Sequence, residues 1–489
     1  MTYYLAIDQG THASRACLFD EAGLLVSEHT RNIKLKRISS THIEQDADEI
    51  INSVKEVVAQ LLHELEPHQT IAACGIAIQR SSVIAWQKDG TAISPVLSWQ
   101  DTRGSRQLDK LRDVESEIQQ LTGLPLSAHY GATKLHYLHG VAKARGIATD
   151  TIRLSPLISY LLFHILDEHP YIVDHTNAQR TQLFSIAELN WSTRLAELFD
   201  VPLQTLPDCL PVLSHTDTAH GTLAGTEIPV TAISGDQNAA FFDSGLLTSE
   251  TALVNLGSGA FVLSLLPQYQ ASKKQLSTIA CSEDSNAQYV REATVNGAGS
   301  ALDWLENRYK IRDLWKQLPT WLETAGLDES GQPPLFINSI GGLGSPWWNN
   351  NIEPGFITDD SSTNIATTEL LPIDQASQAV AVIESIVFMI CINLEIMQAE
   401  QTLSRLRVCG GLSQLDGLCQ RLSDLSDLPV ERLHLPEATA RGIAWLAANK
   451  PDDWSCADAE IFKPGKNAKL YNRYTNYRAI LNNMVNVRT

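Results

Sequence analysis

The feature that most constrains the fold is a pattern that occurs twice in the chain. At residues 3–20 and again at residues 251–264, an apolar strand, a glycine-bearing turn and a second apolar strand follow one another. This succession is typical of a β-hairpin. Because it occurs in both halves, we expect two domains of related build that face each other. We place the boundary near residue 246, which gives domains 1–246 and 247–489.

Length and composition agree with two large domains. A chain of 489 residues exceeds the roughly 250–300 residues at which a single core stops growing. With 44% hydrophobic and 19% charged residues, there is enough apolar material for a sizeable interior. The most apolar long stretch, residues 379–397, is interrupted by Glu384, Asn393 and Glu395. We therefore expect a buried helix there and no membrane span.

Charge and cysteine usage exclude several classes of function. The net charge of −19 repels nucleic acids and anionic membranes, so any phosphate has to be bound locally. The eight cysteines are scattered and form no CxxC pair, which is typical of small core side chains in a reducing compartment. The first residues carry no basic segment or small-residue cleavage site, so we expect a cytoplasmic protein.

Apolar periodicity predicts local elements on both sides of the boundary. Three short apolar runs over residues 3–27 predict an antiparallel meander, followed by a helix over 50–65 and a buried strand over 71–78. This order, strands first and then alternating helices and strands, indicates an α/β fold. For the second half we expect strands at 406–409 and 428–431, with helices beginning near 414 and 438.

Common catalytic motifs are missing from the sequence. It has no GxxxxGK[ST], no GxGxxG after a strand, no HExxH and no GxSxG. What remains is a set of aspartates and glycines at strand ends, such as Asp8-Gln9-Gly10-Thr11 and Gly257-Ser258-Gly259. Glycine-rich turns let backbone N–H groups approach phosphate oxygens, and nearby carboxylates can hold hydrated Mg²⁺. Taken singly, each glycine could also do no more than close a turn.

The combination of short motifs is more informative than any one of them. Their order and spacing along nearly the whole chain resemble those of the FGGY carbohydrate kinases, most closely the glycerol kinases of that family. The matching stretches are residues 8–11, 79–80, 99–103, 176–181, 235–240, 257–259, 342–348, 410–411 and 437–442.

The resemblance implies a fold and a reaction. Members of the family have two α/β domains of the actin-like ATPase (ribonuclease H-like) fold around a central cleft. The N-terminal domain mainly binds the sugar or polyol, and the C-terminal domain mainly binds ATP. The γ-phosphoryl group of MgATP passes to a substrate hydroxyl, so the implied enzyme is a phosphotransferase with an alcohol acceptor. Closing such a cleft aligns donor and acceptor and excludes water.

The resemblance also implies residue roles on the catalytic and nucleotide side. Asp236 matches the catalytic carboxylate that accepts the hydroxyl proton, and Asp8 matches the acidic residue near Mg²⁺. The positions implied to face the nucleotide are Thr11, His12, Arg15, Ser258, Gly299, Asp303, Gly411 and Leu415. Three of these depart from the family pattern: His12 replaces a threonine, Asp303 a glutamine, and Leu415 an asparagine.

On the substrate side, the implied contacts combine charged hydrogen-bonding groups with one apolar wall, which suits a small polyhydroxy ligand. They are Arg80, Ser81, His129, Asp236, Gln237 and Phe261, with Trp99 and Asp101 as support for the pocket. Two of them depart from the glycerol kinases, which have a glutamate at the position of Ser81 and a tyrosine at that of His129. A short hydroxyl in place of a carboxylate removes an acceptor and opens volume. We therefore expect a small polyol or sugar as substrate, with a longer polyol or a ketose favoured and glycerol kept as one candidate.

Other functions remain open at the level of sequence. A pentulose kinase is the nearest alternative enzyme, although Gln79-Arg80 favours the glycerol-kinase side. A carbohydrate or nucleotide sensor that kept the fold and lost turnover is motivated by His12, Asp303 and Leu415. A mechanical ATPase would need an additional domain, and no residues are left over for one. Family members often form homodimers or homotetramers, and the same is expected here.

Overall fold

Five strands form the central sheet of the N-terminal domain, in the order β14-β6-β1-β2-β3. Their bounds are β1 Thr2–Gln9, β2 Ala13–Asp20, β3 Leu25–Asn32, β6 Thr70–Ile78 and β14 Val230–Gly235. The first three strands are antiparallel neighbours, whereas β6 and β14 run parallel to β1. The meander and the strand at 71–78 predicted from the sequence are thereby confirmed.

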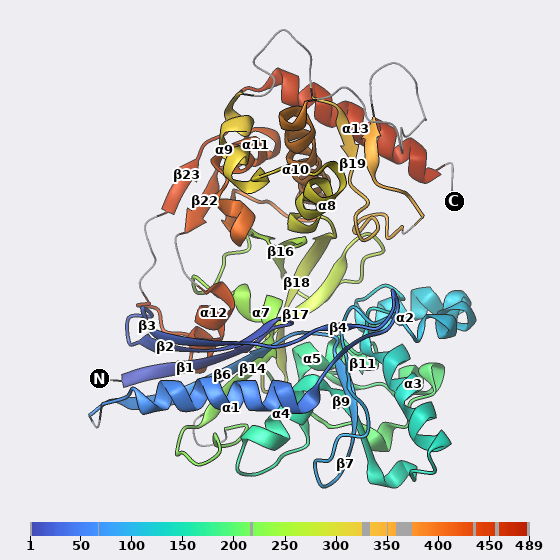
Figure 1. The fold of residues 1–489 in the computed structure, drawn as a ribbon, viewed down its shortest axis with the longest axis vertical. Helices are drawn as coiled ribbons and strands as arrows, with labels where there is room; N and C mark the ends of the chain where they lie inside the picture. Colours follow the sequence, from blue (N-terminus) through green and yellow to red (C-terminus); the bar gives the residue numbers. More distant parts are fainter. Residues whose placement is uncertain are drawn as a thin grey trace.

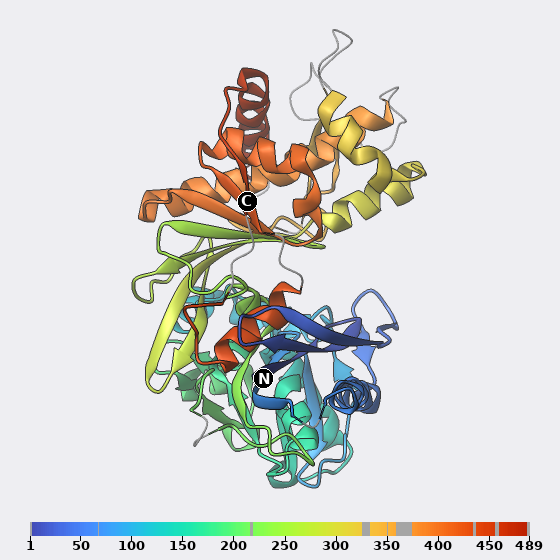
Figure 2. The ribbon, with the colours of Figure 1, turned by 90° about the vertical axis from the view of Figure 1, so that its left-hand side faces the viewer.

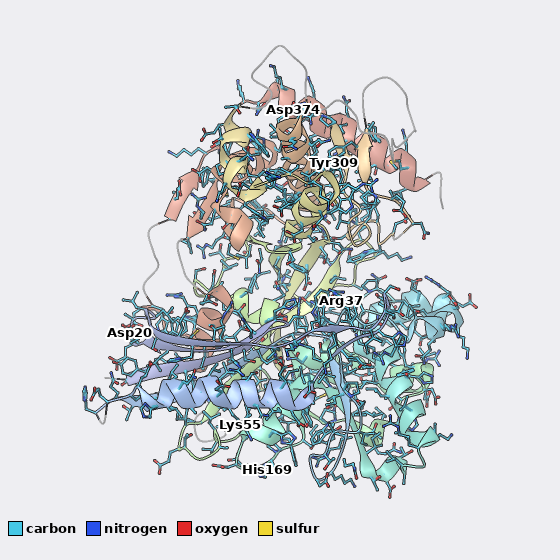
Figure 3. All side chains as sticks on the ribbon, in the orientation of Figure 1. Asp20, Arg37, Lys55, His169, Tyr309 and Asp374 are labelled. Carbon is cyan, nitrogen blue, oxygen red and sulfur yellow. The ribbon has the colours of Figure 1, made fainter. Side chains whose placement is uncertain are left out.

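The computed structural model describes residues 2–66, 68–215, 219–324, 333–349, 351–357, 374–433, 437–454 and 459–486. Its two α/β domains lie one above the other, with the N-terminal domain below in blue to green and the C-terminal domain above in yellow to red (Figure 1). In Figure 3, which adds the side chains, the labelled Asp20 lies in the lower domain and Tyr309 in the upper one.

The sheet of the C-terminal domain repeats this plan. Its order is β17-β18-β16-β15-β21-β22-β23. The hairpin β15–β16 and strand β18 are antiparallel, whereas β21 and β22 run parallel to β15. The two hairpins found in the sequence therefore occupy equivalent places in two related sheets. The bounds are β15 Thr251–Leu256, β16 Ala260–Leu266, β17 Leu276–Glu283, β18 Asn286–Val295, β21 Arg405–Cys409, β22 Val430–Leu433 and β23 Ala459–Phe462.

A second sheet of the N-terminal domain carries the wall beside the predicted substrate pocket. Its order is β4-β5-β8-β7-β9, with β4 Lys36–Arg37, β5 Ile43–Gln45, β7 Val83–Gln87, β8 Val96–Leu97 and β9 Ile152–Pro156. Three two-stranded sheets complete the strands that the structure describes: β10 Ile172–Asp174 with β13 Asp208–Leu210, β11 Phe184–Ser185 with β12 Asn190–Trp191, and β19 Leu335–Ile337 with β20 Gly355–Ile357.

Helices cover the two central sheets. Helix α1, Ala47–His63, begins at Asp46, whose carboxylate accepts hydrogen bonds from the N–H groups of Asp48 and Glu49. It packs against β2 and β3 and ends two residues earlier than the sequence suggested. The other helices are α2 Glu115–Thr122, α3 Gly131–Ala144, α4 Leu157–Ile165, α5 His175–Gln179, α6 Thr193–Phe199, α7 Asp236–Ala240, α8 Gly299–Tyr309, α9 Leu314–Thr324, α10 Gln375–Glu400, α11 Asp416–Ser426, α12 Ala438–Ala447 and α13 Ala468–Asn486.

Helix α10 is the central helix of the C-terminal domain. It is long and apolar enough to span a membrane, but 89% of its most apolar window is buried inside the protein. Its side chains form much of the hydrophobic core together with residues of β15, β16 and α11. The buried helix expected over residues 379–397 is therefore confirmed, with wider bounds.

Two segments cross from the C-terminal half onto the N-terminal domain. Helix α12 packs on β6, β1 and α7, and Figure 1 shows it in red among the blue and green elements. Two glycines allow this close approach. A Cβ added to Gly442 would lie 1.9 Å from the carbonyl oxygen of Ala239, and one added to Gly75 of β6 would lie 2.5 Å from that of Ile443. The hairpin β17–β18 descends along the N-terminal domain (Figure 2), where the side chain of Gln179 donates to the carbonyl of Ser277 at 2.8 Å.

The cysteines that the structure describes are free thiols, five of them buried and two partly buried, as expected for core side chains. Cys456 lies outside the described residues. Among the residues described, His, Cys, Asp and Glu side chains form no cluster of three or more suited to a metal ion.

Candidate active site

Two aspartates meet at one edge of the N-terminal sheet. Asp8 is the penultimate residue of β1, and Asp236 follows directly after β14 as the first residue of α7. Both strands flank β6 and run parallel to it, so their carboxyl ends lie at the same edge. With strands spaced by about 4.8 Å, the two backbones are separated by roughly 10 Å. The carboxylates are close enough to affect each other electrostatically.

Burial raises the pKa of both carboxyls. The pKa of Asp8 rises to about 7, first because the group is buried and then because of Asp236, with the guanidinium of Arg15 opposing the rise. Burial also raises the pKa of Asp236, and Arg80 opposes that rise. Two carboxylates at one edge of the sheet are oxygen ligands that fit a hydrated Mg²⁺ ion, which takes one or two carboxylates and keeps several waters.

Arg80 joins Asp236 to the rest of the site. Its side chain is buried, with Nε 3.5 Å from Asp236 Oδ1 and Nη1 donating to Asn238 Oδ1 at 3.0 Å. Nη1 also lies 3.6 Å from Oε2 of Glu292. Gly235 makes room for the arginine, because a Cβ there would lie 2.5 Å from Arg80 Cδ.

Ser81 and His129 line the same region from the second sheet and the start of α3. Ser81 is buried, and its backbone adopts the left-handed conformation with φ of 64°. Its Oγ has no hydrogen-bond partner among the described residues. The His129 ring packs edge-on against Trp99 and Tyr130, with ring centres 5.5 and 5.1 Å apart. Burial and then the cation of Lys134 lower the pKa of His129 well below its usual value, so the ring is neutral at neutral pH.

The first hairpin carries three of the predicted nucleotide contacts. Trp99 Nε1 donates to Thr11 Oγ1 at 2.9 Å, which ties the hairpin to the aromatic wall. His12 is exposed at the turn. Arg15 is half-buried and lies 3.8 Å from Asp8 Oδ2 and 2.7 Å from Glu437 Oε2.

Gln237 links the two domains beside Asp236. Asn255 Nδ2, on β15, donates to Gln237 Oε1 at 3.1 Å. This bond fixes the acceptor end of the Gln237 amide and leaves its NH₂ group as a donor toward a ligand. Phe261 stands on the neighbouring strand β16, opposite Asn255, and is partly buried.

The second hairpin sits on the N-terminus of α8. The carbonyls of Gly257 and Ser258 accept from the N–H groups of Gly299 and Ser300, each at 3.0 Å. Ser258 is exposed at the tip, and a Cβ added to Gly257 would meet nothing closer than 3.7 Å. The backbone at this turn is therefore open to a phosphate group.

The remaining predicted nucleotide contacts lie on α8 and at the end of β21. Asp303 is exposed one turn into α8, and Gly411 is exposed with nothing within 4 Å of an added Cβ. Leu415 is 7% exposed, and its side chain belongs to the core of the C-terminal domain. The adjacent Asp416 is exposed, and its Oδ1 accepts from Arg432 at 2.7 Å.

Sequence reasoning gave no role to three charged residues at the site. Glu292 of β18 and Arg180 are both buried and joined at 2.5 Å, and Glu437 pairs with Arg15. Arg180 and Glu437 lie within stretches that match the family, so the sequence pointed to both residues although neither was given a role. Glu292 had no such signal, because a lone glutamate in a strand is usually exposed to solvent.

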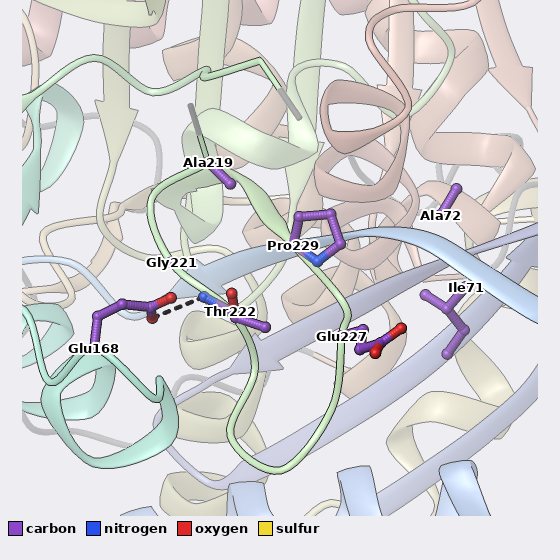
Figure 4. Close-up of a pocket in the computed structure, with 8 residues that line it drawn as sticks. All are labelled: Ile71, Ala72, Glu168, Ala219, Gly221, Thr222, Glu227 and Pro229. Carbon is purple, nitrogen blue, oxygen red and sulfur yellow. Dashed lines mark hydrogen bonds between the residues drawn. The ribbon is translucent and has the colours of Figure 1, made fainter. Parts of the chain in front are cut away.

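A hollow of about 520 Å³ lies elsewhere, on the N-terminal domain. Figure 4 shows it around Glu168, Thr222 and Glu227, where the Glu168 carboxylate accepts from the N–H of Thr222 at 2.9 Å. None of the predicted site residues lines it.

Comparisons with known proteins support these assignments of fold and family. Models of the FGGY family of carbohydrate kinases match residues 3–243 for the N-terminal domain and 252–450 for the C-terminal domain. The chain is 30% identical to a glycerol kinase of Natranaerobius thermophilus, over 94% of this chain and 92% of that protein. It is 32% identical to a glycerol kinase of Acinetobacter baylyi, over 92% and 90%.

Solved structures confirm the fold. The crystal structure of Plasmodium falciparum glycerol kinase with ADP superposes with a TM-score of 0.84 at 21% identity, covering 99% of this chain and 98% of that one. A xylulose kinase from Lactobacillus acidophilus superposes with a TM-score of 0.80 at 17% identity, covering 100% and 98%. The two α/β domains thus have the actin-like ATPase fold, and the chain belongs to the FGGY family of carbohydrate kinases, enzymes that transfer a phosphoryl group to an alcohol.

Proposed function

We propose that this kinase transfers the γ-phosphoryl group of MgATP to a hydroxyl of a polyol longer than glycerol, or of a ketose. The observation that carries the proposal is the arrangement of Asp8, Asp236 and Arg80 at one edge of the sheet, with Arg80 Nε 3.5 Å from Asp236 Oδ1. A carboxylate at that place can accept a hydroxyl proton, and the second carboxylate suits a metal ion.

Asp236 acts as the proton acceptor in this proposal. The substrate hydroxyl donates a hydrogen bond to the carboxylate, which orients the oxygen and takes the proton as the new O–P bond forms. Burial raises the pKa of Asp236, which makes the carboxylate a better base, while the cation of Arg80 opposes that rise. Asp236 also begins α7, so the rigid packing of that helix on α12 fixes its position.

ATP supplies the phosphoryl group, and Mg²⁺ would neutralise charge on its phosphates. Asp8 would hold the hydrated metal ion, with Thr11, His12 and Arg15 of the first hairpin near the phosphates. Ser258, Gly299, Asp303 and Gly411 would face the nucleotide from the C-terminal domain. The open backbone at Gly257 and Gly411 supports this placement. Because Leu415 packs in the core, only its backbone is available to the nucleotide.

The substrate would lie between Arg80, Gln237 and Phe261. The NH₂ group of Gln237 is free to donate because Asn255 occupies its oxygen. Ser81 is shorter than a carboxylate side chain, and the neutral His129 is bounded by Trp99 and Tyr130. This space and its mixed donors and acceptors favour a substrate with more hydroxyls than glycerol.

We also propose that the protein works in the cytoplasm and forms a homodimer or homotetramer. The net charge of −19 supports a small substrate over nucleic acid or an anionic membrane surface.

The test is an ADP-release assay with MgATP against glycerol, tetritols, pentitols, pentuloses and hexuloses. Asp236→Asn should lower kcat by roughly 10²–10⁴-fold and leave substrate binding largely intact. Asp243→Asn is the matched control, because it removes another buried carboxylate seven positions along the chain. Near-full turnover by Asp236→Asn would remove Asp236 from this role. Ligand binding without turnover by the unaltered protein would favour a sensor.

A further inference from the structure

Glu292 is a buried carboxylate at the contact between the two domains. It stands on β18, is 1% exposed and lies between two arginines of the N-terminal domain. Arg180 Nη2 donates to its Oε2 at 2.5 Å, and Arg80 Nη1 lies 3.6 Å from the same oxygen. Thr278 Oγ1 also donates to Oε2, at 3.2 Å. These cations lower the pKa of Glu292 below its usual value, so the group is ionised.

The second carboxylate oxygen of Glu292 accepts no hydrogen bond from the described residues. This oxygen, Oε1, is buried. Leaving a charged acceptor without a donor in a buried site is costly, and buried polar atoms in folded proteins are nearly always paired. The structure built three contacts to Oε2 and none to Oε1. This asymmetry points to a donor that arrives from outside the protein.

Glu292 lies beside residues that are expected to contact the substrate. In the pairing of β16 with β18, Phe261 stands opposite Thr294 and Leu263 opposite Glu292. Because side chains two residues apart in a strand share a face, Glu292 lies on the same face as Phe261, diagonally across the two strands. Arg80 then connects Glu292 directly to Asp236, with Nη1 toward one carboxylate and Nε toward the other.

We propose that Glu292 Oε1 accepts a hydrogen bond from a substrate hydroxyl other than the one that is phosphorylated. This inference rests on the proposed function and deepens it by naming a specificity-determining residue. With a serine at position 81, Asp236 and Glu292 are the two carboxylates that Arg80 contacts. Since Asp236 receives the reacting hydroxyl, Glu292 is available for a second one. The ligand class is a neutral polyhydroxy compound, and a substrate that carries a carboxylate at this point is excluded by repulsion.

Glu292→Gln tests the proposal with little change in shape. Arg180 requires an acceptor, so the amide oxygen takes the place of Oε2 and the NH₂ group takes the place of Oε1. The acceptor that faces the substrate becomes a donor, while the contact with Arg180 remains. Glu384→Gln is the matched control, because Glu384 is also buried and paired with two arginines, Arg473 and Arg421, but lies on α10.

The readout is kcat/KM for the preferred polyol or ketose and for analogues that lack one hydroxyl at a time. For the full substrate, Glu292→Gln should lower kcat/KM by roughly 10–100-fold, mostly through KM. For one analogue, which lacks the hydroxyl that Oε1 contacts, the loss should be less than about threefold. Glu384→Gln should leave the pattern across the analogues unchanged. An equal loss with every analogue would mean that Glu292 is only structural and would overturn the proposal, as would no loss at all.

Calorimetric titration of the same ligands without ATP separates this proposal from the proposed function. A protein that binds a polyol but phosphorylates none, and that loses this binding in Glu292→Gln, would contradict the kinase function and support the role of Glu292. Turnover with the same hydroxyl preference in both proteins would support the kinase and overturn the role of Glu292. An unaltered protein that neither binds nor phosphorylates any ligand of the panel would overturn both.

Discussion

Arg15 Nη1 lies 2.7 Å from Glu437 Oε2, although 422 positions separate the two residues in the sequence. The same nitrogen lies 3.8 Å from Asp8 Oδ2. Glu437 thus accepts a hydrogen bond from the guanidinium of Arg15, a residue that the family resemblance places near the phosphates. Glu437 also adds negative charge near Asp8 and helps to raise the pKa of that carboxyl, whereas Arg15 opposes the rise.

Replacing Glu437 by glutamine should strengthen nucleotide binding. The change releases the guanidinium of Arg15 from a competing carboxylate, and we expect the Kd for ADP to fall by roughly 3–10-fold. Stability should change by less than about 1 kcal/mol, because both side chains are partly exposed to solvent. Isothermal titration with MgADP provides the measurement. Weaker binding in the variant would mean that Glu437 holds Arg15 in its working position instead of competing for it.

Replacing Gly442 by alanine should destabilise the fold and disturb the site together. A Cβ at this position overlaps the carbonyl oxygen of Ala239 on α7, so α12 has to move away from the helix that begins with Asp236. We expect a loss of about 1–3 kcal/mol in unfolding free energy and a lower kcat. The measurements are urea denaturation and steady-state kinetics.

Gly140→Ala is the control for that substitution. Gly140 lies within α3, and nothing is within 4 Å of an added Cβ. Alanine there should stabilise the protein by about 0.5–1 kcal/mol, because it favours the helix. A loss of stability as large as that of Gly442→Ala would contradict the role assigned to the contact between α12 and α7.

Ser81→Glu should shift the substrate preference toward glycerol. The change fills volume near Arg80 and adds an acceptor for hydroxyl groups. We expect the ratio of kcat/KM for glycerol to that for the preferred longer substrate to rise by about tenfold or more. Ser81→Gln, which adds the volume without the charge, separates the two effects. An unchanged ratio in both variants would show that the pocket does not distinguish substrates at this position.

Lys134 should make stability depend on pH above neutrality. Its side chain is fully buried, Nζ donates to the carbonyl of His129 at 2.6 Å, and burial lowers the pKa from 10.5 to about 7. Between about pH 7 and 10.5 the unfolded chain therefore binds more protons at this residue than the folded protein, so the lysine's contribution to stability rises with pH. Below pH 7 both states are charged, and the full cost of burial is present.

The comparison with Lys134→Met isolates that effect. The unfolding free energy of the unaltered protein should rise relative to that of the variant between pH 7 and pH 9. The exposed Lys143, on the same helix, provides the control substitution Lys143→Met, which should show no such trend. Parallel pH profiles for the unaltered protein and Lys134→Met would contradict the prediction. The measurement is urea denaturation at each pH.

Local patterns predicted the hairpins and the aspartates well, because their signals are local. Asp8 and Asp236 stand at strand ends that hydrophobic periodicity identifies, and the turns carry glycines. The position of α12 could not be predicted in this way. Its apolar face at residues 440–447 only indicates that something covers it, whereas the partner, the sheet around β6, is fixed by tertiary packing.

The buried ion pairs of Glu292 with Arg80 and Arg180 could not be predicted from the sequence either. A strand residue such as Glu292 shows no sign that Arg180 and Arg80 will enclose it, because both arginines come from the other domain. The burial of Leu415 was not predicted either. This leucine follows a 3₁₀ turn over Gly411–Gln414, and its side chain packs in the core.

The packing of α12 on the N-terminal sheet has a consequence for folding during synthesis. Ile443 and Trp445, with Trp454 just beyond the helix, complete a hydrophobic cluster that begins with Ala6 and Phe19. On the ribosome, the first domain is made long before these residues leave the exit tunnel. Its sheet must therefore wait, with an apolar surface uncovered, until nearly the whole chain has been translated, and a fragment cut at the domain boundary would keep that surface open.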